Sequence, residues 1–309
     1  MPINIPRNLP AFSVLQSENV FVMSQDAALR QEIRPLRVAV FNIMPTKIAT
    51  ETQLLRLLSN TPLQTDVTLL HPRTHTSKTT PKEHLNAFYK YFDEVRDQRY
   101  DALIVTGAPV EIMPFEEVNY WEELCELFEW SKSHVYSTLH ICWGAQAALF
   151  HHFGIQKFPL ETKMSGVFPH KVVRPHHPII KGFDAVFNVP HSRHTYTRLE
   201  DIEAHHSLSA LAVSDQAGVY LISHTSDRMF FLTGHTEYDL LTLDSEYRRD
   251  SDAGMNPVLP FNYYPNSNPD KTPVNTWSAH ASLFYSNWLN FCVYQQTPYD
   301  LNDIPALVI

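Results

Sequence analysis

Short apolar segments alternate with stretches of helical periodicity through the first half of the chain, and this alternation restricts the fold most strongly. Residues 36–44, 66–70, 102–106 and 135–142 have the apolar character of buried strands. Helical spacing of apolar side chains follows them, from about residues 46, 81, 116 and 144. Strands that alternate with helices form βαβ units, so the sequence predicts an α/β fold built on a parallel sheet.

The 309 residues suffice for one large domain, and we expect a single domain over residues 35–298. Residues 1–34 contain scattered prolines and are predicted to form an extended arm, and residues 299–309 form a tail. Thr80 and Pro81 are expected to begin a helix that continues through Phe92. The second half is predicted to contain a strand meander, a helix, a long loop and a final helix, at residues 210–233, 239–250, 256–275 and 277–294.

Composition excludes several classes of function. The formal net charge of -9 argues against binding to nucleic acid or to an anionic membrane. The eight glycines are too dispersed for a GxGxxG or GxxxxGK loop, which argues against those two kinds of nucleotide site. Three widely spaced cysteines and the absence of a signal-like start or a long apolar stretch predict a cytoplasmic protein.

Cys142 occupies the position at which a predicted strand passes directly into a helix, in HICWGAQAALF. A residue at such a turn is raised above the sheet at a helix N-terminus, where backbone N–H groups can bind an oxyanion and the helix dipole lowers a thiol pKa. Cys125 and Cys292 lie instead on apolar helix faces, as buried core cysteines do. The sequence therefore favours Cys142 as a nucleophile.

A thiol nucleophile needs a base and a group that orients the base, and FFLTGHTEYD supplies both in His235 and Glu237. Alternate residues of an extended segment point the same way, so these two side chains can meet. No metal site is expected, because HExxH and CxxC motifs are absent and the histidine pairs are adjacent, at 151–152, 176–177 and 205–206.

Six segments together resemble the MetA-type homoserine O-acyltransferases of methionine biosynthesis over nearly the whole chain: NIMPTKIATETQLLRLL, VTGAP, HICWGAQA, ETKMSGVFPH, VPHSRHT and LTGHTEYD. The resemblance implies a flavodoxin-like, mostly parallel sheet with helices on both faces, related to the class I glutamine amidotransferases. It also implies a ping-pong reaction in which Cys142 takes an acyl group from an acyl-CoA and passes it to L-homoserine, with His235 as general base.

Further roles follow from the resemblance at matching positions. Lys47 is expected to support the oxyanion region. Lys163, Ser192 and Arg249 match substrate-binding positions, and Arg193 is a further candidate for the homoserine carboxylate, because its planar fork can bond both oxygens. The resemblance also implies a homodimer with acyl-CoA as co-substrate and no permanently bound cofactor.

The same family resemblance places the choice of acyl donor at Glu111 in TGAPVEIMPF. Succinyl-CoA users carry glycine there and acetyl-CoA users carry glutamate, whose charge would repel the distal carboxylate of a succinyl group. We therefore expect acetyl transfer from acetyl-CoA. Glu111 could instead simply begin an acidic loop with Glu116 and Glu117, which would leave succinyl-CoA as the donor.

Two other readings remain open. A glutamine amidotransferase or cysteine hydrolase could use the same fold and the same nucleophile, although the amidotransferase elbow is usually GxCxG and His140 stands at its first position here. A non-catalytic binding module is disfavoured by the intact set of Cys142, His235 and Glu237.

Overall fold

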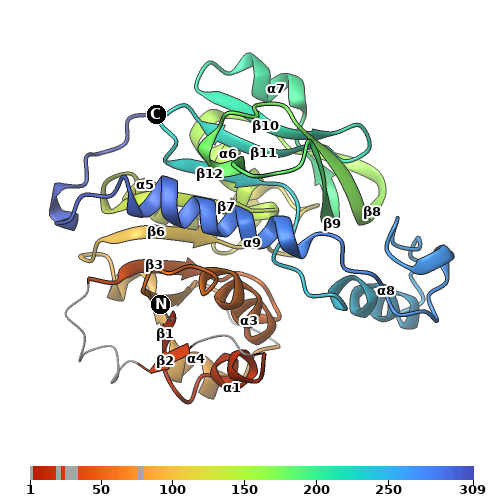
Figure 1. The fold of residues 1–309 in the computed structure, drawn as a ribbon, viewed down its shortest axis with the longest axis horizontal. Helices are drawn as coiled ribbons and strands as arrows, with labels where there is room; N and C mark the ends of the chain where they lie inside the picture. The colour runs from red at the N-terminus through yellow and green to blue at the C-terminus, as the bar shows by residue number, and fades with distance from the viewer. Residues whose placement is uncertain (1–2, 19–21, 25–33, 76–78) are drawn as a thin grey trace.

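A computed structural model describes residues 3–18, 22–24, 34–75 and 79–309. Over these residues the chain forms one twelve-stranded sheet, in the order β2-β1-β4-β3-β6-β7-β12-β11-β10-β8-β9, with β5 beside β4 (Figure 1). The strands are β1 (Ile3–Ile5), β2 (Val22–Ser24), β3 (Leu36–Phe41), β4 (Thr65–His71), β5 (Tyr89–Tyr91), β6 (Tyr100–Val105), β7 (Val135–Ile141), β8 (Phe158–Val172), β9 (Val186–Tyr196), β10 (Leu208–Ser214), β11 (Gly218–His224) and β12 (Met229–Leu232).

The centre of the sheet is parallel and has the flavodoxin-like order. Five strands pair in parallel there, in the spatial order β4, β3, β6, β7 and β12. When these five are renumbered from 1 to 5 along the chain, the spatial order reads 2-1-3-4-5. The strand order reverses between β3 and β6, and ligands of such sheets bind beyond the carboxyl ends of the strands at that point. The predicted fold class is confirmed.

Helices cover both faces of this sheet. They are α1 (Pro10–Ser17), α3 (Lys47–Leu58), α4 (Lys82–Phe88), α5 (Trp121–His134), α6 (Trp143–Phe153), α7 (Leu199–Ala204), α8 (Thr242–Asp252) and α9 (Ser278–Asn287), which a π-helical segment, Trp288–Tyr294, continues. One buried apolar cluster joins the sheet to α1, α3 and α9, and a second joins it to α5, α6 and α7. Figure 1 shows α9 crossing the sheet, while α8 projects to one side.

The predicted extended arm is wrong for the described part of residues 1–34. β1 pairs in parallel with β2 and β4, so this segment widens the sheet, and Leu15 of α1 is fully buried in the core. The tail also packs against the domain, because Leu307 N–H donates to the Lys132 carbonyl (2.7 Å) and Arg228 donates to the Pro305 carbonyl (2.7 Å).

Two further expectations need correction. The helix predicted to continue through Phe92 ends at Phe88, because residues 89–91 pair with β4 as strand β5. The long antiparallel hairpin of β8 and β9 was not predicted, because its polar residues and prolines hide the strand pattern. The predicted meander of β10, β11 and β12 is confirmed.

No helix within the described ranges is long and apolar enough to cross a membrane.

Candidate active site

Cys142 lies in a strained turn between β7 and α6. Its backbone has φ 50° and ψ −114°, in a region that non-glycine residues rarely adopt. The helix after it approaches β6 so closely that a Cβ on Gly144 would lie 2.5 Å from the Thr106 carbonyl oxygen. Glycine at 144 is therefore what lets the helix begin here and hold the thiol at the carboxyl edge of the sheet.

Pairing of β7 with β12 brings the base to this thiol. Ile141 is the register partner of Leu232, and the Cys142 N–H extends the ladder by donating to the Leu232 carbonyl (2.6 Å). The chain after β12 then turns back, with the His235 N–H donating to the Pro190 carbonyl (2.8 Å). The ends of two neighbouring strands thus place Cys142 beside His235, where the thiol acts on the charge of the imidazole.

His235 and Glu237 form the pair that the sequence predicted. His235 Nδ1 lies 2.6 Å from Glu237 Oε1, which leaves Nε2 for the thiol. The two side chains are only 4% and 6% exposed, and the second carboxylate oxygen of Glu237 has no hydrogen-bond partner in the described structure. Because the Glu237 carboxylate is buried and its second oxygen has no partner, its negative charge acts chiefly on the His235 imidazole.

The charge balance at His235 favours the imidazolium. Burial alone would lower the pKa of His235, but the adjacent Cys142 and Glu237 outweigh burial and raise that pKa well above its ordinary value. Burial instead raises the pKa of Cys125 to about 11 and that of Cys292 to about 12. Cys142 is therefore the thiol whose surroundings provide a proton acceptor.

Space for a reacting group is left beside Gly107, at the end of β6. A Cβ placed there would lie 3.3 Å from the Cys142 Cβ and 3.4 Å from the His235 Cε1. A larger residue at 107 would therefore crowd both the nucleophile and the base.

A charged cluster adjoins the base. The Tyr238 ring stacks on His235, and its hydroxyl donates to Glu246 (3.0 Å). Ser192 donates to the other oxygen of the same carboxylate. The structure therefore connects the imidazole to the substrate-binding positions predicted on β9 and β8.

Lys163 and Arg249 complete this cluster through a second carboxylate. Lys163 Nζ lies 2.9 Å from Asp250 and 3.6 Å from Glu246. Arg249 lies 2.7 Å from Asp250, while two-thirds of its side chain remains exposed. Lys163, Ser192 and Arg249 are thus brought together, with two cationic and two anionic groups in one place.

Arg193 does not join this cluster. Neighbouring residues of a strand point to opposite faces, so Ser192 faces Glu246 while Arg193 points into the interior. Its guanidinium is buried and donates to the carbonyls of Thr195 (2.7 Å) and Ala217. These bonds leave Arg193 poorly placed to receive a substrate carboxylate, and its predicted binding role stays a prediction.

Lys47 lies at the carboxyl end of β3, at the start of α3. Its ammonium group donates to the carbonyls of Asn42 (2.5 Å) and Met44 (3.0 Å), and burial lowers its pKa to about 8. Glu51, one turn further along α3, partly opposes this effect. Lys47 therefore holds the loop after β3, and its oxyanion role stays a prediction.

Glu111 is half-buried in the loop after β6, at the same edge of the sheet as Cys142. The charge of Glu111 acts on Tyr120 and on Lys157, where burial lowers the lysine pKa to about 8 and Glu111 opposes that effect. Lys157 in turn donates to the Met113 carbonyl and lies over the Phe115 ring. The charge at position 111 thus belongs to a packed part of the loop.

Sequence reasoning missed Tyr238, Glu246 and Asp250. A signal was present, because Glu246, Arg249 and Asp250 are spaced by three and four residues and so share one face of a helix. That helix begins directly after the HTEY segment.

A cluster that could hold a metal ion lies elsewhere. Glu129, His151 and His152 bring ligand atoms within 4.8 Å of one another, although the adjacent histidines were expected to diverge. Glu129 is already paired with Lys132 and His151. The two histidines are at the far end of α6 from Cys142, so this cluster is separate from the triad.

Comparison with known proteins decides the family. A family profile described as homoserine O-succinyltransferase matches residues 2–299. The chain belongs to this family. It is thus a member of an acyltransferase family, and the resemblance seen in its motifs is confirmed.

The relatives with high identity to this chain are named for the acetyl group, whereas the family description names the succinyl group. A homoserine O-acetyltransferase of Acetivibrio thermocellus is 57% identical, with 98% of this chain and 100% of the relative covered. One of Brevibacillus brevis, also named homoserine O-acetyltransferase, is 55% identical over 98% of this chain and 99% of its own.

Solved structures agree on the fold. A glutamine amidotransferase of Thermotoga maritima has a TM-score of 0.51 at 12% identity, covering 84% of this chain and 99% of its own. This likeness shows the class I amidotransferase-like architecture alone, as the sequence predicted.

Proposed function

We propose that the protein is a homoserine O-acetyltransferase that carries an acetyl group from acetyl-CoA on Cys142 to the hydroxyl of L-homoserine. The observation that supports this most is the strained Cys142 beside His235, whose Nδ1 lies 2.6 Å from Glu237. The names of the relatives support the acetyl group, and the family supports homoserine.

In the first half-reaction, the Cys142 sulfur attacks the thioester carbonyl of acetyl-CoA while His235 holds the thiol proton. The first N–H groups of α6, on Trp143 and Gly144, precede the first bond of the helix, from Gln146 N–H to the Cys142 carbonyl (3.1 Å). Such N–H groups can stabilise the oxyanion. Collapse breaks the bond to the CoA sulfur, which takes the proton from His235 and leaves acetyl-Cys142.

In the second half-reaction, His235 Nε2 removes the proton of the homoserine hydroxyl as its oxygen attacks the acetyl-Cys142 carbonyl. The carbon–sulfur bond then breaks, and the proton passes from His235 to the Cys142 sulfur. Glu237 keeps the imidazole in the required tautomer and stabilises its charged form.

The charged cluster beside Tyr238 suits the rest of homoserine. Arg249 offers an exposed planar fork to the α-carboxylate, with Lys163 beside it. Glu246, bonded to Ser192 and Tyr238, offers a carboxylate to the α-ammonium group. Because Tyr238 stacks on His235, this arrangement puts the amino-acid end of the substrate next to the base.

Acetyl-CoA is proposed as the donor because Glu111 places a negative charge beyond β6, next to the strand that carries Cys142. A succinyl group would bring a second carboxylate toward this charge. Lys47 is proposed to support the oxyanion region indirectly, by holding the loop after β3.

A cytoplasmic, homodimeric enzyme without a permanently bound cofactor completes the proposal. Three free cysteines suit a reducing compartment. Analytical ultracentrifugation would test the dimer directly.

The deciding experiment is intact-mass spectrometry of the protein mixed with acetyl-CoA or with succinyl-CoA, before and after addition of homoserine. Wild type and the matched controls Cys125→Ala and Cys292→Ala should gain one acetyl group that homoserine removes, and Cys142→Ala should gain none. A succinyl adduct in its place would keep the mechanism and reject the donor. Absence of any adduct would reject acyl transfer through Cys142.

A further inference from the structure

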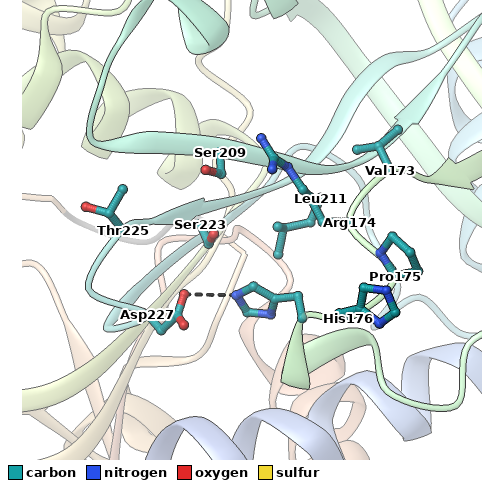
Figure 2. Close-up of a pocket in the computed structure, with 10 residues that line it drawn as sticks. Val173, Arg174, Pro175, His176, Ser209, Leu211, Ser223, Thr225 and Asp227 are labelled. Atoms are coloured by element: carbon teal, nitrogen blue, oxygen red, sulfur yellow. Dashed lines mark hydrogen bonds and ion pairs between the residues drawn. The ribbon is translucent and has the colours of Figure 1, made fainter.

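A cavity of about 440 Å³ lies away from the triad. Its walls come from the loop after β8, from β10 and β11, and from the turn between β11 and β12 (Figure 2). β12 begins beside that turn at Met229 and ends at Leu232, which bonds to Cys142. The cavity is therefore at the opposite edge of the sheet from the nucleophile.

Hydroxyl groups without partners line the floor. Ser223 is only 2% exposed, faces the cavity, and its hydroxyl makes no hydrogen bond within the described residues. Ser209 is its register partner on β10 and lines the same cavity. The Ser223 hydroxyl is therefore open to the cavity and available to a ligand there.

A single unpaired cation stands over these hydroxyls. Arg174 lines the cavity, and its guanidinium forms no hydrogen bond or ion pair with the described residues. In the view of Figure 2, Arg174 and Asp227 lie on opposite sides of Ser223.

Asp227 is the negative group of the cavity. His177 Nδ1 accepts a hydrogen bond from the Ile179 N–H (3.2 Å), so its Nε2 carries the hydrogen that it donates to Asp227 (2.9 Å). Asp227 is thus bonded to His177, and no Lys or Arg side chain among the described residues pairs with it. The cavity is thus cationic at one side and anionic at the other.

Part of the remaining wall is apolar, and Pro175, His176 and Thr225 complete the lining. Leu211, buried on β10, and Val173, whose N–H donates to the Leu211 carbonyl (2.9 Å), present hydrocarbon surface to the cavity. A ligand that fits Arg174, the two serine hydroxyls and this hydrocarbon surface carries one anionic group and a short apolar chain. A second carboxylate would meet Asp227.

We propose that this cavity binds a small monocarboxylate with an apolar chain, with its carboxylate on Arg174 and the hydroxyls of Ser209 and Ser223, and its chain against Leu211 and Val173. The site is separate from the acyl-transfer site and does not depend on the proposed function.

The test uses hexanoate as the probe and isothermal titration calorimetry of the full chain. Saturable binding with a Kd on the order of 1 mM is expected for a ligand of this size. Hexylamine and hexanol should bind at least tenfold more weakly, because they lack the carboxylate, and adipate should bind more weakly than hexanoate because Asp227 repels its second carboxylate.

Variants decide whether the assignment is right. Arg174→Gln, at an exposed position, should weaken hexanoate binding about tenfold or more, and Ser223→Ala about threefold, whereas the exposed control Arg7→Gln should bind like wild type. Circular dichroism would show that the variants are folded. Equal affinity of wild type and Arg174→Gln, equal binding of hexylamine, or a loss seen only in Arg249→Gln, which would place the ligand in the acyl-transfer site, would each overturn the proposal.

Discussion

The Tyr238 ring stacks on the His235 imidazole, with centroids 4.2 Å apart and planes inclined by 18°. Because the Tyr238 hydroxyl donates to Glu246, one side chain both supports the base and positions a carboxylate of the charged cluster. The base is therefore connected to the charged cluster in which we propose that homoserine binds.

Tyr238→Phe keeps the stacking and removes the hydroxyl. We expect Cys142 to be acetylated at the wild-type rate, while KM for homoserine rises about three- to tenfold because Glu246 loses a hydrogen bond. Tyr264→Phe is the matched control, since its hydroxyl binds Asp244 of the same helix. Stopped-flow acetylation and steady-state kinetics would separate the two effects, and a slower acetylation step would contradict this assignment.

Glu237→Gln should lower kcat by about 10²- to 10⁴-fold, because the imidazole loses its orienting charge. Glu237 also raises the pKa of His235, so the limb of the pH–rate profile that reports the base should move to lower pH in the variant. The exposed Glu200→Gln serves as control. An unchanged profile would mean that Glu237 does not act on the base.

Glu111→Gly should raise kcat/KM for succinyl-CoA by about ten- to a hundredfold, because removal of the charge relieves a repulsion of several kcal/mol at most. Glu116→Gly, in the same loop but exposed, should leave the donor preference as it is. Rates with both donors give the answer, and equal preference in wild type and Glu111→Gly would show that the selector lies elsewhere.

Gly144→Ala should lower the free energy of unfolding by about 1–3 kcal/mol, because its Cβ would meet the Thr106 carbonyl oxygen at 2.5 Å. Activity of the folded fraction should fall too, since α6 must shift and carries Cys142 with it. Gly154→Ala, at the other end of α6, places its Cβ in open space, so only its φ of 69° should lower the free energy of unfolding, by about 1 kcal/mol. Urea unfolding combined with activity would distinguish them.

Stability should decline as pH falls below about 6.5, the ordinary pKa of histidine. Burial lowers the pKa of His140 to about 3, so between these values the unfolded chain binds a proton that the folded chain does not. The stability is therefore present above the unfolded pKa and is lost as pH falls, by about 1.4 kcal/mol per unit for each such group. Urea unfolding from pH 5 to 7 should give a shallower slope for His140→Gln than for wild type or the exposed control His194→Gln.

The centre of the fold and the proximity of Cys142, His235 and Glu237 could be predicted because local signals specify them. Buried strands have apolar runs, and Cys142, His235 and Glu237 directly follow strands whose ends meet at one edge. The edges could not be predicted, since β1 and β2 are three-residue strands whose partners are distant in sequence. Strand pairing and burial decided those segments.

The charged cluster was also only partly predictable from the sequence. Lys163, Ser192 and Arg249 came from motif resemblance, but the bonds that join them through Glu246 and Asp250 depend on how α8 packs against the β8–β9 hairpin. Arg193 was predicted to bind substrate like its neighbour Ser192. Adjacent residues of a strand point to opposite faces, however, so the two side chains point apart.

The hydrogen bond from Cys142 to Leu232 also has a consequence for folding. β12 lies between β7 and β11 in the sheet. Because β12 is synthesised long after Cys142, a partly synthesised chain contains the thiol but lacks the base. The reactive pair forms only when this last central strand docks, a contact of large sequence separation that is expected to be slow. Gain of thiol reactivity during refolding would therefore time the closure of the parallel sheet.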